Sequence, residues 1–295
     1  MKKKFIFITE ANAQKNISFG HFFRSFEISK ILKKLGYKVY FHINQNKFSK
    51  KFLKQKKFFL FKDLKQILNL KDKKDYKIIV DLFKIERKFL KSLKNFYSLI
   101  VFDDFQKIKN LKSAKILNFN KYKSIKYFRI LNIKKVRNAN KNYLAINTGG
   151  SDLGRNHSKL IKKILKEKLN ENIKIFFYVG PGVKKYKIYK KNIKNIFFIR
   201  DNNLFNNKAF KSKFIVSSGG ISMFEYLFFK KKIFAIPTGD YEKLNIKNLI
   251  KKKYLLKFNF LKSFEDNFKL SKKIKNKKII KIKKIKKDFR KIFLN

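Results

Sequence analysis

The sequence contains no cysteine and no tryptophan, and its 295 residues include only two prolines and ten glycines. The lack of cysteine excludes disulfide bonds and thiolate metal sites, and it fits a reducing compartment. No apolar run approaches the roughly 18 residues that a membrane-spanning helix needs. The first apolar run, Phe5–Thr9, is too short for the hydrophobic part of a signal peptide and is followed by Glu10. We therefore predict a soluble, cytoplasmic protein.

Acidic residues are also scarce, with 19 Asp and Glu against 78 Lys and Arg, which gives a net charge of +59. One interpretation is a protein that binds nucleic acid or anionic membranes. The other is a bias of composition, because Asn, Ile and Phe are abundant together with Lys, as AT-rich codons would produce. The lysines are spread along the whole chain instead of forming one stripe, and patterning carries more information about binding than total charge. We therefore favour the bias and expect no specific nucleic-acid partner.

The first half of the chain alternates between strand and helix patterns. Phe5–Thr9 is typical of a buried strand, and apolar residues then recur at helical spacing until Gly36, which ends the helix. Tyr37–Ile43 again has a strand pattern, so these segments form a β-α-β unit. The same analysis predicts further strands and one helix, over Lys77–Val80, Leu99–Phe102, Lys115–Leu117 and Ile85–Phe96.

A second alternating set follows a polar, weakly patterned stretch, with a linker predicted near Val136–Lys141. Alternation of this kind predicts parallel sheets covered by helices on both faces. We expect an α/β protein with two doubly wound, Rossmann-like domains, residues 1–136 and 137–295, and a ligand cleft between them at the carboxyl ends of the strands. The predicted strands of the second half are Tyr143–Asn147, Lys174–Val179, Ile196–Ile199, Phe214–Val216 and Ile233–Ile236, and its helices are 156–169, 222–229 and 244–252.

The segment from Gly219 to Ser222 joins a predicted strand to a predicted helix. Glycines let the backbone approach a ligand, and the N–H groups at a helix N-terminus attract phosphate. Glu225, one turn into the helix, is placed to accept hydrogen bonds from ribose hydroxyls. The alternative is a tight turn between strand and helix, in which the negative charge of Glu225 interacts favourably with the helix dipole.

Two other strand ends carry polar residues. Gly149 to Asp152 would form either a ligand-binding turn or a plain turn in which Ser151 or Asp152 caps the next helix. Asp103-Asp104 has no third carboxylate nearby in the sequence, so we predict no metal site.

His21, one of only three histidines, lies between the first strand and the first helix. An imidazole titrates near neutral pH, which suits a general base. Arg24 lies three residues later on the same helix face and would meet an anion. The alternative is a polar residue that only marks the start of the helix.

The C-terminal segment places Ile282, Ile285, Phe289 and Ile292 on one helical face among lysines. We favour a terminal helix that packs this face on the body of the protein, and weak contact with a membrane surface is the alternative.

Taken together, these motifs resemble the UDP-sugar hydrolases of pseudaminic acid biosynthesis, which act on UDP-2,4-diacetamido-2,4,6-trideoxy-β-L-altropyranose, and the related spore-coat polysaccharide proteins. The resemblance runs from about Phe5 to Leu255. It rests on "SFGHFFRSFEISKILKKLGYKV", "IVFDD", "KYFRI", "INTGGSDLGRN", "FYVGPG" and "IVSSGGISMFEYLFFKKKIFAIP".

The resemblance implies a glycosyltransferase-B-like fold, no metal and no cofactor. It implies that His21 activates water against the anomeric carbon, which releases UDP and a free amino sugar for a nonulosonic acid or a surface polysaccharide. The expected substrate-binding residues are Gly20, Arg24, Asp103, Gly150, Asp152 and Asn156. The expected nucleotide-binding residues are Gly180, Gly219, Gly220, Ser222, Glu225 and Glu242.

Two departures bear on the substrate. Ser18 replaces the first glycine of the family's His21 motif, and Tyr241-Glu242 replaces an Asn-Gln pair. A carboxylate at Glu242 would accept hydrogen bonds from sugar hydroxyls or amides, and it would repel a diphosphate that came too close. A UDP-sugar glycosyltransferase, in which an acceptor hydroxyl replaces water, is the nearest alternative function, and an RNA-binding protein is a more distant one.

Overall fold

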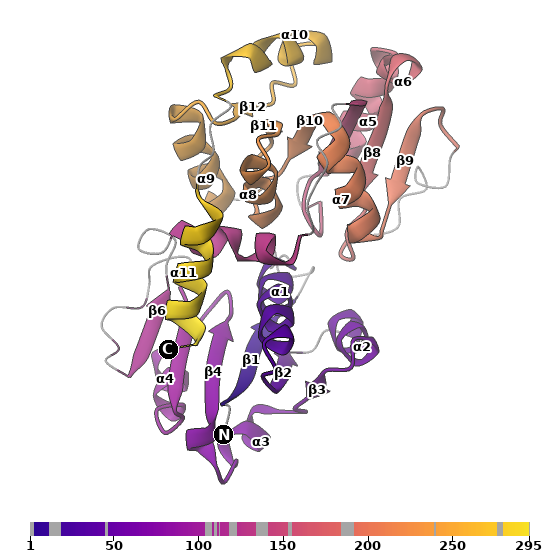
Figure 1. The fold of residues 1–295 in the computed structure, drawn as a ribbon. Coiled ribbons are helices and arrows are strands. Elements are labelled where there is room, and N and C mark those ends of the chain that lie inside the picture. Colours follow the sequence, from indigo (N-terminus) through magenta and orange to yellow (C-terminus); the bar gives the residue numbers. More distant parts are fainter. Residues whose placement is uncertain are drawn as a thin grey trace. The chain divides into compact units, whose positions relative to one another are not determined.

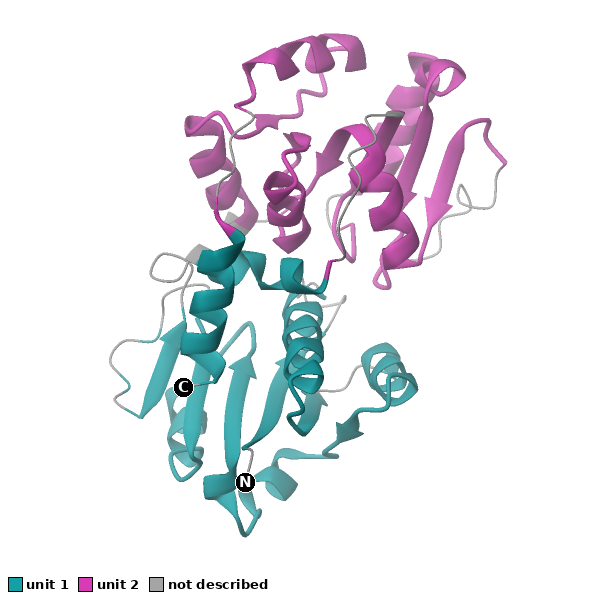
Figure 2. Ribbon diagram, in the orientation of Figure 1, with its two compact units in different colours: residues 1–132, 282–295 teal, residues 133–281 magenta. Residues whose placement is uncertain are grey.

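The structure is a computed structural model that describes residues 3–11, 19–44, 47–103, 108, 111, 113–117, 123–133, 141–152, 155–183, 192–238, 240–275 and 280–294. Its chain forms two compact units (Figure 2). Unit 1 comprises Met1–Asn132 and Ile282–Asn295, and unit 2 comprises Ile133–Lys281. The predicted linker near Val136–Lys141 lies mostly outside the described residues.

Unit 1 is built on a six-stranded parallel sheet with the order β3-β2-β1-β4-β5-β6 (Figure 1). Its central strands contain uninterrupted apolar runs such as Phe5–Ile8 and Ile78–Val80, as expected for parallel strands buried on both faces. Ile6 and Ile78 contribute to the core on one face, and the rings of Phe7 and Phe41 stack 5.1 Å apart. The strands are β1 (Lys4–Glu10), β2 (Val39–Asn44), β3 (Phe59–Leu60), β4 (Tyr76–Asp81), β5 (Ser98–Phe102) and β6 (Ala114–Leu117).

In the described part of unit 1, four α-helices and the 3₁₀ segment η1 connect these strands, and the 3₁₀ segment η2 follows β6. Helix α1 carries the functional residues of this unit and ends before Gly36, which has a positive φ of 81°. The predicted helix over Ile85–Phe96 is shorter in the structure. The elements are α1 (Gly20–Lys34), α2 (Lys47–Gln55), α3 (Leu64–Leu68), η1 (Lys73–Asp75), α4 (Arg87–Ser92) and η2 (Lys123–Asn132).

The last helix, α11 (Ile282–Phe293), belongs to unit 1, whereas the sequence-based division placed it in the second domain. Its apolar face is buried as predicted, and Phe289 packs edge-on against Phe128 of η2 with ring centroids 5.3 Å apart. The ammonium group of Lys77 donates to the carbonyl of Phe293 at 3.1 Å, near the C-terminal end of α11. Burial lowers the pKa of Lys77, which is consistent with an ammonium group enclosed between the sheet and this helix.

Unit 2 contains a second six-stranded parallel sheet, with the order β12-β11-β10-β7-β8-β9. When the strands are numbered along the chain within each unit, this order is the same as that of unit 1. In both sheets, successive strands are added first toward one edge and then toward the other, and this change occurs at one internal strand pair. That pair is β1 and β4 in unit 1, and β7 and β10 in unit 2. The strands are β7 (Lys141–Asn147), β8 (Lys174–Tyr178), β9 (Ile196–Ile199), β10 (Ser212–Ser217), β11 (Lys232–Ala235) and β12 (Leu256–Lys257).

The helices of unit 2 mostly follow the predicted spans, except that the helix expected over 156–169 ends at Lys166 and a separate turn follows. Among the described elements of unit 2, the helical elements α7, α10 and η4 and the short strand β12 had no counterpart among the sequence-based predictions. The elements are α5 (Asn156–Lys166), α6 (Leu169–Asn172), α7 (Asn202–Lys211), α8 (Ile221–Phe228), α9 (Asp240–Lys251), α10 (Phe264–Lys269) and η4 (Leu270–Lys273).

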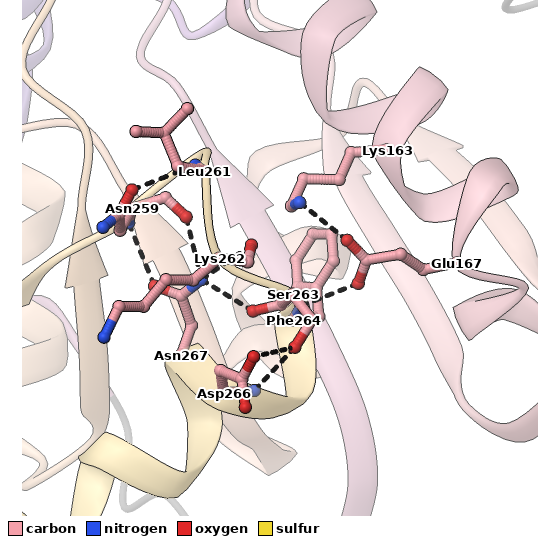
Figure 3. A network of polar contacts seen from close by, with 9 residues as sticks. All are labelled: Lys163, Glu167, Asn259, Leu261, Lys262, Ser263, Phe264, Asp266 and Asn267. Atoms are coloured by element: carbon pink, nitrogen blue, oxygen red, sulfur yellow. Dashed lines mark hydrogen bonds and ion pairs between the residues drawn. The ribbon is translucent and has the colours of Figure 1, made fainter.

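A polar network attaches α10 to the rest of unit 2 (Figure 3). Ser263 caps α10 by accepting from the N–H of Asp266 at 2.9 Å. The N–H of Phe264 donates at 2.7 Å to Glu167, which also pairs with Lys163 of α5. The amide of Asn267 donates to the carbonyl of Asn259 at 2.9 Å. These contacts fix α10 against the end of α5.

Candidate functional site

Both sheets place their marked residues at the same topological position. In doubly wound sheets, ligands bind beyond the carboxyl ends of the strands where the strand order reverses. In unit 1 this position lies after β1 and β4, and in unit 2 after β7 and β10. His21 follows β1, Asp81 ends β4, Gly149 follows β7 and Gly219 follows β10.

In unit 1, Asp81 joins His21 and Arg24 into one buried cluster. Oδ1 of Asp81 lies 2.7 Å from Nδ1 of His21 and also accepts from Nη2 of Arg24. Oδ2 of Asp81 accepts from Nε of Arg24 at 2.8 Å and from the hydroxyl of Ser25 at 3.1 Å. Asp81 is fully buried and Arg24 is 2% exposed, so the ion pair is shielded from water.

The charge state of Asp81 follows from these contacts. Burial acts to raise the pKa of the carboxyl, but the guanidinium of Arg24 and the ring of His21 outweigh it and lower the pKa to about 2. Asp81 is therefore a carboxylate at neutral pH and only accepts hydrogen bonds. His21 consequently donates Nδ1–H to Asp81, and in the neutral ring Nε2 carries the lone pair that a general base requires.

Aromatic rings and a second carboxylate surround this cluster. The guanidinium of Arg24 lies 4.3 Å from the centroid of the Phe102 ring at the end of β5. The ring of His21 meets Phe83 edge-on at 6.4 Å, and the N–H of Phe83 donates to the carboxylate of Glu10. The loop after β4 is thus fixed to the end of β1, beside the imidazole.

Asp103, a predicted substrate-binding residue, is held by its own loop. Its carboxylate accepts from the N–H of Ile108 at 2.8 Å, and its N–H donates to Leu117 at 2.9 Å. Gly20 is the first residue of α1. Asp81 was not among the predicted site residues. An aspartate directly after the apolar run Ile78–Val80 indicates a strand end, but only the sheet shows that this strand lies next to β1.

In unit 2, the turns after β8 and β10 each contact the end of β7 or the turn that follows it. The N–H of Gly182 donates to the carbonyl of Gly150 at 2.8 Å, and the N–H of Ser218 donates to Asn147 at 2.8 Å. A Cβ atom on Gly180 would overlap the backbone of Gly150, so only glycine fits there. The structure thus brings the predicted residues Gly150 and Gly180 into contact, and the turn that begins at Ser218 and contains Gly219 adjoins the end of β7.

Glu242 lies directly on the turn that precedes α8. A Cβ atom on Gly219 would come within 2.7 Å of the Glu242 Cβ, and one on Gly220 would lie 3.3 Å from its Oε1. The other carboxylate oxygen accepts from the N–H and the hydroxyl of Thr238, at 3.0 and 2.5 Å. Burial raises the pKa of Glu242, and hydrogen bonds from Thr238, the Gly219 backbone and Ser218 act against this rise.

Asp152 has a structural function in this unit. Its carboxylate accepts from the N–H groups of Asn156 and His157, at 3.0 and 3.1 Å, at the start of α5. It therefore caps the helix, which was the alternative interpretation of this motif. Burial lowers the pKa of the neighbouring His157, against the opposing effect of Asp152.

Three buried polar atoms close to the same turn have no hydrogen-bond partner within the described part of the chain. They are Oγ1 of Thr148, Oγ of Ser151 and Nδ2 of Asn156. Buried polar atoms of this kind are uncommon and call for a partner such as a ligand or water. Ser222 is the second residue of α8, and Glu225, one turn further, has a fully buried side chain.

Comparisons with known proteins support one architecture. No family model and no curated protein sequence matches the chain. Among solved structures, MurG from Acinetobacter baumannii is similar with a TM-score of 0.51 and 11% identity, over 99% of this chain and 100% of that one. UDP-GlcNAc 2-epimerase from Methanocaldococcus jannaschii, in complex with UDP-GlcNAc and UDP, has a TM-score of 0.55 and 12% identity over 100% of both chains.

The spinosyn forosaminyltransferase SpnP has a TM-score of 0.56 and 10% identity, over 99% of this chain and 95% of that one. The chain has the GT-B fold. At these identities the similarity establishes the architecture, as the sequence analysis predicted, and the more specific resemblance to one hydrolase family stays a prediction. Among the described residues, no helix is both long and apolar enough to cross a membrane, and no three His, Asp or Glu side chains are grouped to hold a metal ion.

Proposed function

We propose that this protein cleaves the bond between UDP and the anomeric carbon of a nucleotide sugar, with water as the acceptor. The observation that carries the proposal is the His21–Asp81 contact of 2.7 Å at the switch point of a GT-B sheet. A histidine oriented by a buried carboxylate is a general base whose reactive nitrogen is defined.

The chemical step needs only groups of this chain, the substrate and water. Nε2 of His21 takes a proton from water as the water oxygen forms a bond to the anomeric carbon. The bond from that carbon to the phosphate oxygen breaks, and its electron pair leaves with UDP. The carboxylate of Asp81 stabilises the imidazolium that results, while Arg24 holds Asp81 in place.

The nucleotide is assigned to unit 2. The contiguous turns at Gly150, Gly180 and Gly219 offer backbone N–H groups at the carboxyl ends of the strands, and α8 directs its N-terminus toward the same turn. Glu225 is assigned to the ribose hydroxyls. The preferred substrate is a UDP-linked deoxy amino sugar, on the motif resemblance described above.

A glycosyltransferase is the second candidate, because the similar structures include a forosaminyltransferase and MurG as well as a UDP-GlcNAc 2-epimerase. In a transferase, His21 would take the proton from an acceptor hydroxyl instead of water.

The test is to incubate the protein with UDP-linked amino sugars, with and without lipid and sugar acceptors, and to identify all products. UDP and free sugar in equal amounts without an acceptor support hydrolysis. UDP release that requires an acceptor supports transfer, and an intact nucleotide sugar with inverted configuration supports epimerisation. His21→Ala is the matched control, and UDP release unaffected by this substitution contradicts the proposed mechanism.

A further inference from the structure

The turn that should receive phosphate already holds a carboxylate of the same chain. The backbone of Glu242 packs on Gly219. The side-chain oxygen Oε1 of Glu242 lies 3.3 Å from the position that a Cβ atom on Gly220 would occupy. Thr238 holds Oε2 with two hydrogen bonds. Asn245, one turn further along α9, donates to the carbonyl of Gly219 at 3.4 Å and fixes the helix in the same position.

The contacts of this carboxylate are those that an anionic ligand would make. N–H groups at the start of a helix bind anions through direct hydrogen bonds and through the helix dipole. Oε1 of Glu242 and Oγ of Ser218 lie 3.3 and 3.6 Å from the position of a Cβ on Gly220, so the carboxylate occupies the space beside this turn. The Gly219 backbone and the Ser218 hydroxyl act to lower the pKa of Glu242, as donors beside an anion do. A phosphate placed there would lose these donors to the carboxylate and would meet a like charge at short range.

We propose that Glu242 is an internal competitor for phosphate, which a nucleotide diphosphate must displace before it uses the amide groups of the Gly219–Gly220 turn. The proposal rests on the proposed function only for the identity of the nucleotide. When a binding-competent state is a minor fraction of the protein, the apparent affinity of every ligand that needs this state falls by the same factor. Glu242 therefore weakens UDP and inorganic pyrophosphate equally, and does not affect uridine, which carries no phosphate.

Competition by Glu242 would make the site selective for nucleotides over other phosphates, which matters in a chain with a net charge of +59. Such a charge attracts phosphates and polyanions of all kinds. A ligand that binds only through its phosphates would seldom displace Glu242 at ordinary concentrations. A nucleotide that also binds through its base and ribose has additional binding energy for the displacement.

The experiment measures the binding of UDP, pyrophosphate and uridine by calorimetry at one fixed salt concentration. The variants are Glu242→Gln, which keeps the shape and removes the charge, and Glu242→Ala, which empties the turn. Glu265→Gln is the control for net charge, because Glu265 is an exposed residue of α10 whose carboxylate contacts Lys269 of the same helix at 2.8 Å. Thermal unfolding shows whether each variant is folded. If Glu242→Ala does not fold, the comparison of affinities rests on Glu242→Gln.

We expect both Glu242 variants to bind UDP and pyrophosphate at least tenfold more tightly than the wild type, by the same factor for the two ligands. Uridine affinity should not change, and Glu265→Gln should match the wild type throughout. UDP and pyrophosphate affinities in Glu242→Gln that equal or fall below those of the wild type overturn the inference, as does the absence of pyrophosphate binding in every variant. Tighter pyrophosphate binding without any binding of UDP or uridine upholds the role of Glu242 and refutes the nucleotide assignment.

Discussion

His21 and Asp81 lie 2.7 Å apart through Nδ1 and Oδ1, although 60 residues separate them in the sequence. The contact exists because β1 and β4 are neighbours in the sheet, with Thr9 paired to Asp81, and because α1, which carries His21, packs on both strands. Asp81 thereby determines which nitrogen of His21 carries the proton. It also ties the imidazole to the buried guanidinium of Arg24.

If His21 is the general base, His21→Ala lowers turnover by a factor on the order of 10²–10⁴ and leaves UDP affinity nearly unchanged. The reason is that the substitution removes the proton acceptor and leaves every assigned nucleotide contact in place. The measurements are the rate of UDP release at saturating substrate and UDP binding by calorimetry. Wild-type turnover in the variant would refute the role of His21.

Asp81→Asn should destabilise the protein by about 3–5 kcal/mol, because it leaves the guanidinium of Arg24 buried without its counter-charge. Urea unfolding at neutral pH measures the effect. Asp75→Asn is the matched control, since Asp75 is partly exposed and contacts Lys4 at 3.7 Å, so its loss should leave the unfolding midpoint unchanged. Equal midpoints for the two variants would mean that the buried pair contributes nothing.

The lowered pKa of Asp81 predicts that the stability of the folded protein decreases at acid pH. Asp81 has a folded-state pKa of about 2, below its ordinary value of 3.8. A lowered carboxyl pKa contributes stability that is complete above the unfolded-state pKa and is lost as pH falls through the folded-state value. The contribution of Asp81 should therefore disappear between about pH 4 and pH 2, and unfolding curves of the wild type and Asp81→Asn should converge over that range. Parallel curves from pH 7 down to pH 2 would contradict the assignment.

The sequence predicted this architecture well because buried parallel strands appear as uninterrupted apolar runs, as Ile78–Val80 does. It predicted His21 and Arg24 on one helix face because helical spacing is local. It did not predict Asp81, because pairing across the sheet depends on which strands become neighbours. Helical periodicity likewise revealed the apolar face of α11, because the spacing is local. It did not reveal that this face packs on Phe128, which lies far away in the sequence.

Glu225 provides a test of nucleotide binding. Glu225→Gln keeps the volume of a fully buried side chain and removes its charge, so packing changes little. If the carboxylate accepts from the ribose, UDP affinity should fall about tenfold, because hydrogen bonds to a charged group contribute about 1.5–3 kcal/mol. Deoxyuridine diphosphate, which lacks one ribose hydroxyl, should lose less affinity in the variant than UDP does. Unchanged UDP affinity would leave Glu225 as a helix residue only.

The pH dependence of the stability contributed by Glu242 should be opposite to that of Asp81. Its pKa in the folded protein is raised above the ordinary value of 4.5, so folding favours the protonated form. This contribution is complete below about pH 4.5 and is lost as pH rises through the folded-state pKa. Glu242→Gln, which is always neutral, should therefore match the wild type at pH 4 and be more stable at pH 8. Denaturant unfolding at these two pH values gives the comparison, and a variant that is less stable at pH 8 would contradict it.

The strand order of the GT-B fold places β1 and β4 side by side, but the first unit is not made from one continuous stretch of chain. Residues 1–132 provide its sheet, and residues 282–295 provide the helix whose Phe289 covers Phe128. During synthesis the sheet of unit 1 emerges first, and all of unit 2 follows before α11 exists. Until then the apolar surface around Phe128 lacks its cover, and transiently exposed surface of this kind promotes aggregation. Helix α11, made after unit 2, thus completes a unit whose sheet was made before it, and a chain cut anywhere before residue 282 would leave the surface around Phe128 without this helix.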